Sequence, residues 1–322
     1  MRRHHIACTL AIFCGLGSAS SGTAQDVAPK QVRIVVPFSA GASNDAIARA
    51  ISPQLSKRLE SNIVVENRPG AAGIIGADSV AKAPKDGSVL LLTSATFLTA
   101  AATRTRMPYD PLTSFTPVAI VAQNPSVLAI SAFAPIRTPA QLMTIASAKP
   151  NWLTYGTPGV GSIGHLTTEL MNGAAKVEMR HIPYKGAANA AIDLAGGQID
   201  VMISSFTTLS PFVKSGKVRL LAVTSHEPHP AFPEIPTLTS VVPGVVNYTW
   251  AGVLAPAGAP SALVERLNRE ITGIAGSAEL RRFFEPEGML PVPLSTAGFA
   301  MRMKHELGQW KKIAAAKNIV AE

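Results

Sequence analysis

The sequence has little cysteine and few aromatic residues. Its 322 residues include only two cysteines, Cys8 and Cys14, both near the N-terminus. Beyond residue 14 the chain offers no thiolate for a disulfide, a zinc site or nucleophilic catalysis. Aromatic residues make up 6% of the chain. Because nucleic-acid sites combine stacking rings with clustered cations, this scarcity argues against a nucleic-acid partner.

Long apolar runs are also missing after the first residues. The chain opens with the basic pair Arg2-Arg3, continues with an apolar stretch from Ile6 to about Leu16, and then has small residues up to Ala24. This three-part pattern predicts a secretory signal peptide over residues 1–24, because the apolar stretch is too short for a permanent membrane span. No later stretch approaches ~20 apolar residues. We therefore expect a soluble protein exported to the periplasm.

The charge of the chain is positive but dispersed. There are 29 Lys and Arg residues against 20 Asp and Glu residues, which gives a formal net charge of +9. The cations are scattered along the chain, which again disfavours a nucleic-acid groove. A diffuse positive field favours small anionic solutes by steering them toward the protein. The same charge could instead serve solubility alone, and both interpretations stay open.

After the N-terminal segment the chain alternates between strand and helix patterns. Continuous apolar runs such as Val32–Phe38 and Val89–Thr93 predict strands that are buried on both faces. Helical spacing of apolar residues, as in Asn44–Leu59, predicts the helices between them. This alternation predicts an α/β protein in which mostly parallel sheets are flanked by helices.

Two places in this alternation suggest a division into two domains. The apolar runs near residues 118–130 and 245–254 are interrupted by polar or proline residues, with a polar turn expected at Gln123–Pro125. Such interruptions are typical of hinge crossings between domains. We therefore expect a discontinuous domain 1 of residues 25–124 plus 248–322, and a domain 2 of residues 125–247.

Four joints between strands and helices contain glycine and small residues. They are Pro37–Asp45, Asn67–Gly73, Thr154–His165 and Pro183–Ala187. Ligands of parallel sheets bind at such joints, where helix N-termini present unpaired N–H groups and a partial positive charge. Ser43 or Asn44 could cap the helix after the first joint, and Ser162 the helix after the third. A turn that merely needs glycine explains each joint alone, but four together favour an anion site.

The sequence contains no convincing catalytic or cofactor motif. Gly159, Gly161 and Gly164 match a dinucleotide-binding pattern, but Glu178 stands at the start of the next predicted strand, where the ribose-binding acidic residue would be expected at its end. No phosphate-binding P-loop, zinc-protease motif or serine nucleophile elbow is present. We therefore expect a binding protein without cofactor, metal site or catalytic residues, and not an enzyme.

An ordered series of segments resembles a known family, the periplasmic solute-binding receptors of tripartite tricarboxylate transporters, or Bug receptors. The segments that carry the resemblance are Val35–Gly41, Val64–Ala71, Lys85–Gly87, Tyr155–Ser162 with His165-Leu166, Ile182–Gly186, Gly197–Asp200, Gly216–Arg219 with Leu221–Val223, Pro236–Leu238 and Ala255–Gly258. They cover nearly the whole chain after the signal peptide. Such a series is far more specific than any single motif.

The resemblance implies a two-domain "Venus flytrap" that pins a solute carboxylate between the loops at Phe38–Ser43 and Thr157–Ser162, largely through backbone N–H groups and ordered waters. The ligand-binding candidates are Phe38, Ser39, Ala40, Gly41 and Ala42 in the first loop, Thr157, Gly159, Val160, Gly161 and Ser162 in the second, and Asn67, Ser94, Thr96, His165 and Asp200 elsewhere. Asp200 could equally cap a turn.

The resemblance also implies the partners of the protein and leaves two biological roles open, transport and signalling. It implies a monomer that captures an organic, amino or aromatic acid and docks on the membrane permease subunits of a tripartite transporter. An orphan sensor that passes its closed form to a membrane signalling protein is the alternative. Ala42 stands where the family usually has a second glycine, and Asn44 where Thr is frequent. We expect these two changes to narrow the first loop without removing its backbone donors.

Overall fold

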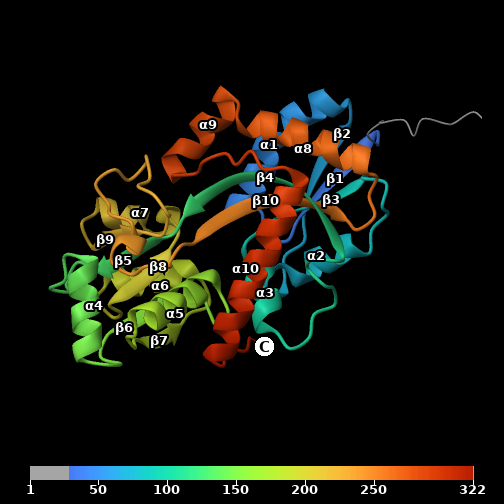
Figure 1. The fold of residues 1–322 in the computed structure, drawn as a ribbon. Coiled ribbons are helices and arrows are strands. Elements are labelled where there is room, and N and C mark those ends of the chain that lie inside the picture. The colour runs from blue at the N-terminus through green and yellow to red at the C-terminus, as the bar shows by residue number, and fades with distance from the viewer. Residues whose placement is uncertain (1–28, 322) are drawn as a thin grey trace, which may run out of the picture.

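The computed structural model describes residues 29–321 and contains two five-stranded β-sheets with helices on both faces of each (Figure 1). The predicted signal peptide, residues 1–24, lies outside the described residues. The strands of the first sheet come from both ends of the described chain, and those of the second come from its middle. We call each sheet with its covering helices the first unit and the second unit.

The first sheet has the strand order β2-β1-β3-β10-β4. Its strands are β1 (Gln31–Val36), β2 (Asn62–Asn67), β3 (Val89–Ser94), β4 (Phe115–Pro125) and β10 (Tyr248–Pro256). β1 pairs in parallel with β2 and β3, whereas β10 runs antiparallel to β3 and β4. All residues of β3 are buried, as expected for a strand that is covered on both faces.

The second sheet repeats this topology with the order β7-β6-β8-β5-β9. Its strands are β5 (Val127–Ser131), β6 (Thr154–Thr157), β7 (Arg180–Pro183), β8 (Val201–Ser204) and β9 (Val218–Val223). β6 pairs in parallel with β7 and β8, and β5 is antiparallel to β8 and β9. The predicted α/β fold with two mostly parallel sheets is confirmed, and each sheet contains one antiparallel strand.

Helices cover both faces of the first sheet. One face packs against α1 (Ser43–Leu59), α8 (Ser261–Ala275) and α9 (Ala278–Phe284), and the other against α2 (Ile74–Ala81), α3 (Thr96–Thr103) and α10 (Thr296–Ala316). In α8 the buried positions Leu263, Leu267, Ile271 and Ile274 recur at intervals of three and four, which places them on one helical face. The late helices α8 and α10 thus pack on the first sheet beside the early ones.

Helices cover the second sheet in the same way. One face packs against α4 (Pro139–Ala148) and α5 (Ile163–Ala175), and the other against α6 (Ala187–Ala195) and α7 (Phe206–Lys214). Short 3-10 turns occur at Ala71–Gly73, Leu238–Ser240 and Glu285–Glu287. None of the helices in residues 29–321 combines the length and the apolar composition that a membrane span requires.

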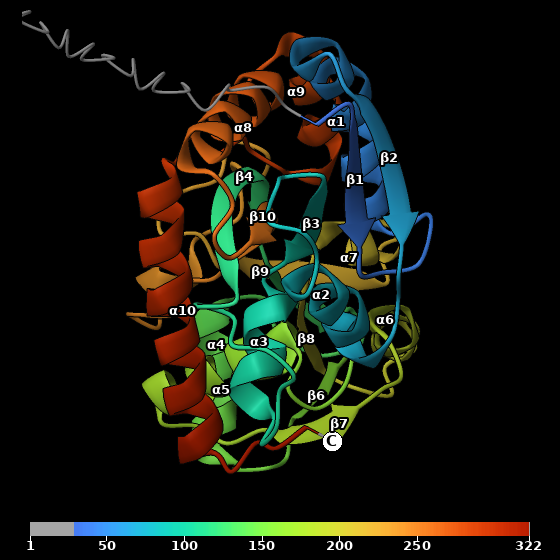
Figure 2. The ribbon, with the colours of Figure 1, turned by 90° about the vertical axis from the view of Figure 1, so that its right-hand side faces the viewer.

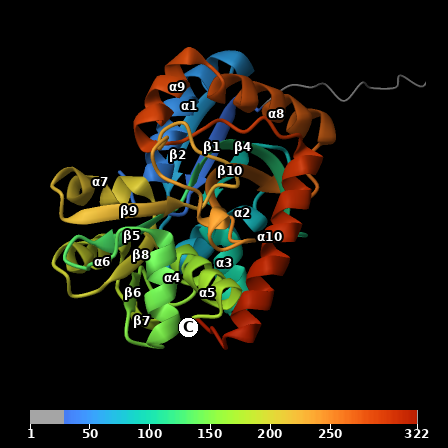
Figure 3. The same cartoon turned by 60° about the vertical axis from the view of Figure 1, so that its left-hand side comes forward.

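Helix α10 runs past both units. Figures 1 and 3 show it extending from the first sheet toward α5 of the second unit. Near its end Lys317 forms an ion pair with Glu169 of α5 at 3.1 Å, and the Ala321 N–H donates to the Thr103 carbonyl at the end of α3. Leu166 of α5 is buried in the same apolar cluster as α3 and α10. The two units therefore share a packed contact in addition to their chain crossings.

The chain crosses between the units twice. The first crossing leads from β4 through Ser126 into β5, and the second leads from β9 through a long loop into β10. Gln123–Pro125 does not form the predicted polar turn but is extended strand paired with Tyr248–Trp250. The prediction was wrong because the polar backbone finds partners on two sides, β10 on one and Leu290 on the other.

A buried polar cluster joins the two crossings. The Thr224 hydroxyl accepts the Ser126 N–H at 2.9 Å and lies 2.6 Å from the Asn247 carbonyl, to which it donates. The Asn247 side chain donates to the Ser126 hydroxyl at 3.2 Å, and all three residues are buried. Both chain crossings therefore pass through one buried, hydrogen-bonded cluster. The domain limits expected from the sequence fall beside this cluster and stay a prediction.

Candidate functional site

The helices that follow the parallel strands present their N-termini at facing edges of the two sheets. In the first unit β1 leads into α1 and β3 into α3; in the second β6 leads into α5 and β8 into α7. Figure 2 shows the arrowheads of β1 and β2 directed toward the second unit. At Gly161 the units touch, since a Cβ placed there would lie 2.5 Å from the Thr103 hydroxyl. These joints form the candidate site.

The first loop, Phe38–Ala42, is exposed at its tip and anchored from behind. Ser39, Ala40 and Gly41 are exposed. Gly41 has φ +81°, a conformation that glycine adopts without strain. Its N–H donates to the Asp45 carboxylate at 2.9 Å, and this buried carboxylate holds the loop in place.

Asp45 is itself fixed by two side chains. Arg49 donates to it at 3.0 Å, and Asn67 donates to it at 3.0 Å and to the Phe38 carbonyl at 3.1 Å. The Arg49 hydrogen bond and the Gly41 N–H hold the pKa of Asp45 at about 2. The remaining Asn67 oxygen accepts from Arg49. Asn67, which the sequence suggested as a ligand contact, therefore positions the first loop.

Helix α1 begins without a side-chain cap. Its N-cap residue is Ala42, so neither Ser43 nor Asn44 caps the helix as the sequence suggested. Both lie inside the first turn, where a side chain cannot reach the leading N–H groups in the way an N-cap side chain does. Ala42 has φ −70°, which a side chain tolerates, so the usual glycine is not required there. The first turn of α1 keeps N–H groups that no N-cap side chain occupies, although the ionised Asp45 in the same turn offsets part of the positive end of the helix dipole.

The second loop, Thr157–Ser162, bonds mainly to itself and to α5. The Ser162 hydroxyl caps α5 by accepting the His165 N–H at 3.4 Å, which confirms the expected cap, and it donates to the Gly159 carbonyl at 2.7 Å. The Gly161 N–H donates to His165 Nδ1 at 3.2 Å. Val160 is exposed at the tip of the loop. Several donors that the sequence assigned to a ligand are thus occupied within the protein.

Two stacked imidazole rings support the second loop from below. The His165 and His181 ring centroids are 3.9 Å apart, and His181 also stacks on Tyr155. His181 Nε2 lies 2.6 Å from the Thr157 hydroxyl. Burial, and then the neighbouring His165, lower the pKa of His181 to about 4, and burial also lowers the pKa of His165. His165 therefore supports the loop as a neutral acceptor.

Two further candidates lie at the β3–α3 joint. Ser94 is buried at the end of β3, and Thr96 begins α3 with its N–H 3.4 Å from the Ser94 hydroxyl. Because β3 is the neighbour of β1, this joint lies at the same sheet edge as the first loop. Ser94 and Thr96 thus belong to the group of loops that face the second unit.

Asp200 does not join this group. It precedes β8, so it lies at the amino edge of the second sheet, whereas the second loop leaves the carboxyl end of the adjacent β6. Its carboxylate accepts the N–H and the hydroxyl of Thr154 at 2.8 and 2.9 Å. These bonds tie the starts of β6 and β8 together, which matches the turn-capping interpretation.

The structure adds a joint that sequence reasoning missed. β8 ends at Ser204, Ser205 is the N-cap of α7, and the Ser205 side chain makes no capping bond but lies 2.9 Å from the Thr208 hydroxyl. Since β8 neighbours β6, this joint lies at the same edge as the second loop. Ser204 and Ser205, which follow an apolar run, were the sequence signal for this joint. Pro211 argues against a helix from sequence alone, although it lies inside α7.

Within residues 29–321 no group of three or more His, Cys, Asp or Glu side chains could hold a metal ion. The site consists instead of loops and helix N-termini, an arrangement suited to binding an anion through N–H and hydroxyl groups.

Comparison with known proteins agrees with this geometry. The model of the tripartite tricarboxylate transporter family receptor matches residues 47–319. The chain belongs to this family. BugT of Bordetella pertussis is 30% identical over 317 residues, which are 96% of this chain and 96% of BugT.

Two solved structures share the fold over most of their length. R. palustris Rpa4515 with adipate has a TM-score of 0.78 and 34% identity, with 90% of this chain and 98% of that chain covered. MatC from Rhodopseudomonas palustris with bound malate has a TM-score of 0.73 and 28% identity, with 88% and 98% covered. Members of this family are binding receptors, and the chain is a receptor and not an enzyme.

Proposed function

We propose that this receptor captures a small organic acid in the periplasm and delivers it to the membrane permease of a tripartite transporter. The observation that carries the proposal is the uncapped N-terminus of α1 behind the exposed first loop, in a family whose relatives Rpa4515 and MatC were solved with adipate and malate. A carboxylate is the complement of such a helix end, because it accepts several N–H groups and meets the positive end of the dipole.

In the proposed binding mode the first turn of α1 and the first loop hold one carboxylate. The second loop, pre-shaped by Ser162 and His165, closes over it from the other unit. The hydroxyl-bearing joints at Ser94–Thr96 and Ser205 supply hydrogen bonds to the distal part of the solute. The dicarboxylates of the two relatives favour a solute with a second polar group at that end.

Capture then proceeds by closure. The solute enters while the units are apart, and rotation about the cluster of Ser126, Thr224 and Asn247 brings the loops together. A solute that contacts both units stabilises the closed form by its extra contacts there. In this proposal one protein molecule suffices, because both loops belong to the same chain.

Isothermal titration calorimetry of the mature protein tests the proposal. The panel would contain mono-, di- and tricarboxylates, with the matching diol of each dicarboxylate and a neutral sugar as controls. We expect at least one carboxylate to bind and its diol not to bind. Binding of the sugar or the diols without any carboxylate would contradict the proposal.

Uptake measurements test the delivery step. Deletion of the gene should abolish uptake of the radiolabelled acid identified by calorimetry, and the wild-type gene should restore it. Unchanged uptake together with a lost transcriptional response to that acid would support a sensor instead.

A further inference from the structure

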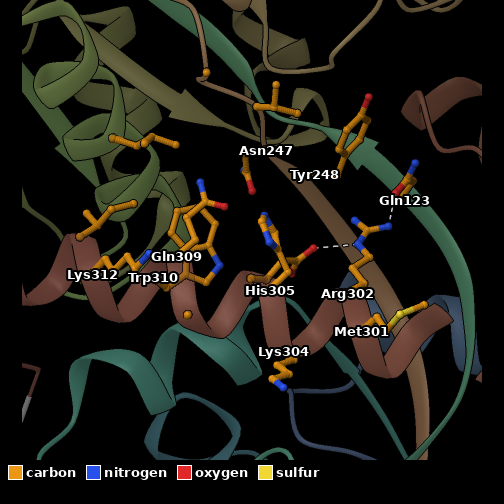
Figure 4. Close-up of a pocket in the computed structure, with 16 residues that line it drawn as sticks. Gln123, Asn247, Tyr248, Met301, Arg302, Lys304, His305, Gln309, Trp310 and Lys312 are labelled. Atoms are coloured by element: carbon orange, nitrogen blue, oxygen red, sulfur yellow. Dashed lines mark hydrogen bonds and ion pairs between the residues drawn. The ribbon is translucent and has the colours of Figure 1, made fainter. Parts of the chain in front are cut away.

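A concave surface lies beside the second chain crossing, and none of the residues of the two candidate-site loops lines it. It is a groove of about 1110 Å³ between α10 and the second chain crossing. Figure 4 shows its two walls, with Arg302, His305 and Gln309 on α10 and Asn247 and Tyr248 on the crossing strand. We call it the α10 groove.

The walls of the α10 groove belong to both units. α10 packs on the first sheet, whereas Leu170, which also lines the groove, lies on α5 of the second unit. The floor includes Asn247, a member of the buried polar cluster at the crossings. The groove therefore lies where the two units meet.

The carboxylate of Glu306 in the α10 groove is paired with other side chains of the protein. Glu306 accepts from Arg302 at 2.7 Å and from the Trp250 indole N–H at 2.9 Å. Arg302 also donates to Gln123 at 2.6 Å (Figure 4). Because these bonds occupy the Glu306 carboxylate, its negative charge does not repel an anionic partner strongly.

Two lysines of the groove, by contrast, have no such partner. Lys304 and Lys312 line it, and neither forms an ion pair or hydrogen bond with any described residue. The Trp310 indole N–H, in the same lining, is buried and has no acceptor among the described residues. The buried Trp310 donor lacks an acceptor, and the two exposed lysines give this part of the groove a positive charge that attracts acidic groups.

The groove also has an apolar component. Met301 is 69% exposed at one end, and Leu170 and Ile313 contribute further apolar surface. Exposed methionine beside cations suits a partner that offers acidic and apolar side chains together. A small inorganic anion would leave this apolar surface uncovered.

We propose that the α10 groove docks an acidic, partly apolar segment of the membrane subunits that receive the solute. The inference rests on the proposed receptor function, since it assumes a membrane partner. Because the unpaired lysine side chains of the groove are positively charged, we expect the bound segment to be acidic. Because the groove spans both units, the segment binds one hinge angle better than the other, so docking and solute capture influence each other reciprocally.

Fluorescence anisotropy tests this docking with a defined probe. The probe is a labelled hexapeptide of alternating glutamate and leucine, and the control peptide replaces each glutamate with lysine. We expect the mature protein to bind the acidic peptide and not the basic one. Equal displacement of the probe by free glutamate and by unlabelled peptide would show a small-anion site and overturn the docking assignment.

Two charge-matched variants locate the binding. Lys304→Glu with Lys312→Glu should weaken peptide binding at least tenfold. Lys57→Glu with Lys311→Glu makes the same change in net charge, and Lys311 is the neighbour of Lys312 on α10 but does not line the groove. This control should weaken binding less than threefold. An equal loss in both variants would show that only diffuse charge attracts the peptide.

Calorimetry with the solute carboxylate is run on the same proteins. The groove variants should bind the carboxylate as the wild type does, because the changed residues lie outside the candidate site. If no form binds a carboxylate, the proposed function fails while the peptide result still decides the groove. If the groove variants alone lose the carboxylate, they disturb the fold and the tenfold loss is not evidence of docking, which overturns the assignment.

Discussion

The two facing loops of this receptor are held in different ways. In the first unit, α1 starts at Ala42 without a side-chain cap, and the loop tip before it is exposed. In the second unit, Ser162 caps α5, and the Gly161 N–H is bonded to His165. The Gly41 N–H is bonded in the same way, to Asp45, so the two loops differ in the cap: the Ser162 hydroxyl occupies an N–H of α5, whereas no N-cap side chain occupies one of α1. The comparison assigns anion binding chiefly to the first loop and shape chiefly to the second.

A charge placed at the first loop should have the largest effect. Ala42→Asp supplies the missing N-cap but places a second carboxylate three residues from the ionised Asp45, so we expect no net gain in the stability of the free protein. The new carboxylate occupies the helix end and repels the solute, and carboxylate affinity measured by calorimetry should fall at least about 100-fold. Ala42→Asn supplies the N-cap without a charge. Its affinity for the carboxylate should be at least tenfold higher than that of Ala42→Asp. Equal affinities of the two variants would refute the assignment.

Glycine-to-alanine changes compare the two loops directly. Gly41 and Gly161 have similar positive φ values, +81° and +76°, so both changes strain the backbone. A Cβ at Gly41 meets nothing within 4 Å, whereas one at Gly161 meets the Thr103 hydroxyl at 2.5 Å. Gly161→Ala should therefore cost about 1–3 kcal/mol more stability in urea denaturation than Gly41→Ala. A larger loss for Gly41→Ala would contradict the close contact between the units.

Removing the charge of Asp45 should loosen the first loop alone. Asp45→Asn weakens the bonds from Gly41 and Arg49, and we expect a loss of about 1–3 kcal/mol of stability together with weaker carboxylate binding. Because the pKa of Asp45 is lower in the folded protein than in the unfolded chain, the ionised carboxylate stabilises the folded protein at pH values above the ordinary pKa of an aspartate. This contribution disappears as the pH falls toward about 2. Asp45→Asn should lack this acid-dependent part, which denaturation at several pH values would reveal.

The smallest of the expected effects is a loss of stability at mildly acidic pH, which arises in the second loop. The pKa of His181 is lowered from 6.5 to about 4, so the unfolded chain binds a proton more readily than the folded protein. The contribution of His181 to stability is fully present well above pH 6.5 and decreases as the pH drops from 6.5 toward 4, by up to about 2 kcal/mol at pH 5. His181→Gln should flatten this dependence in thermal denaturation. The same change at exposed His226 should leave the dependence in place, and a flat wild-type profile would contradict the role of the stack.

Much of the fold follows from local patterns in the sequence. The apolar run Val32–Phe38 corresponds to β1, and the helical spacing of Asn44–Leu59 corresponds to α1, because buried strands and amphipathic helices leave a direct periodic signal. The expected turn at Gln123–Pro125 failed because pairing with β10 and Leu290 arises from distant parts of the chain. Local propensity does not contain that information.

The candidate site was harder to predict than the fold. The two loops could be found from glycine-rich joints, and the Ser162 cap from the residue type at its position. The roles of individual residues could not, since they depend on which partner occupies each polar group. Asn67 bonds to the first loop and Asp200 to Thr154, and no sequence pattern announces either bond.

A crystal structure with the tightest-binding carboxylate tests the account most directly. We expect one carboxylate of the solute to accept hydrogen bonds of about 3 Å from backbone N–H groups in the first turn of α1. Its other end should lie among the joints at Ser94–Thr96 and Ser205. A solute held only by the second unit, or at the amino edge of the second sheet near Asp200, with no carboxylate at α1, would contradict the account.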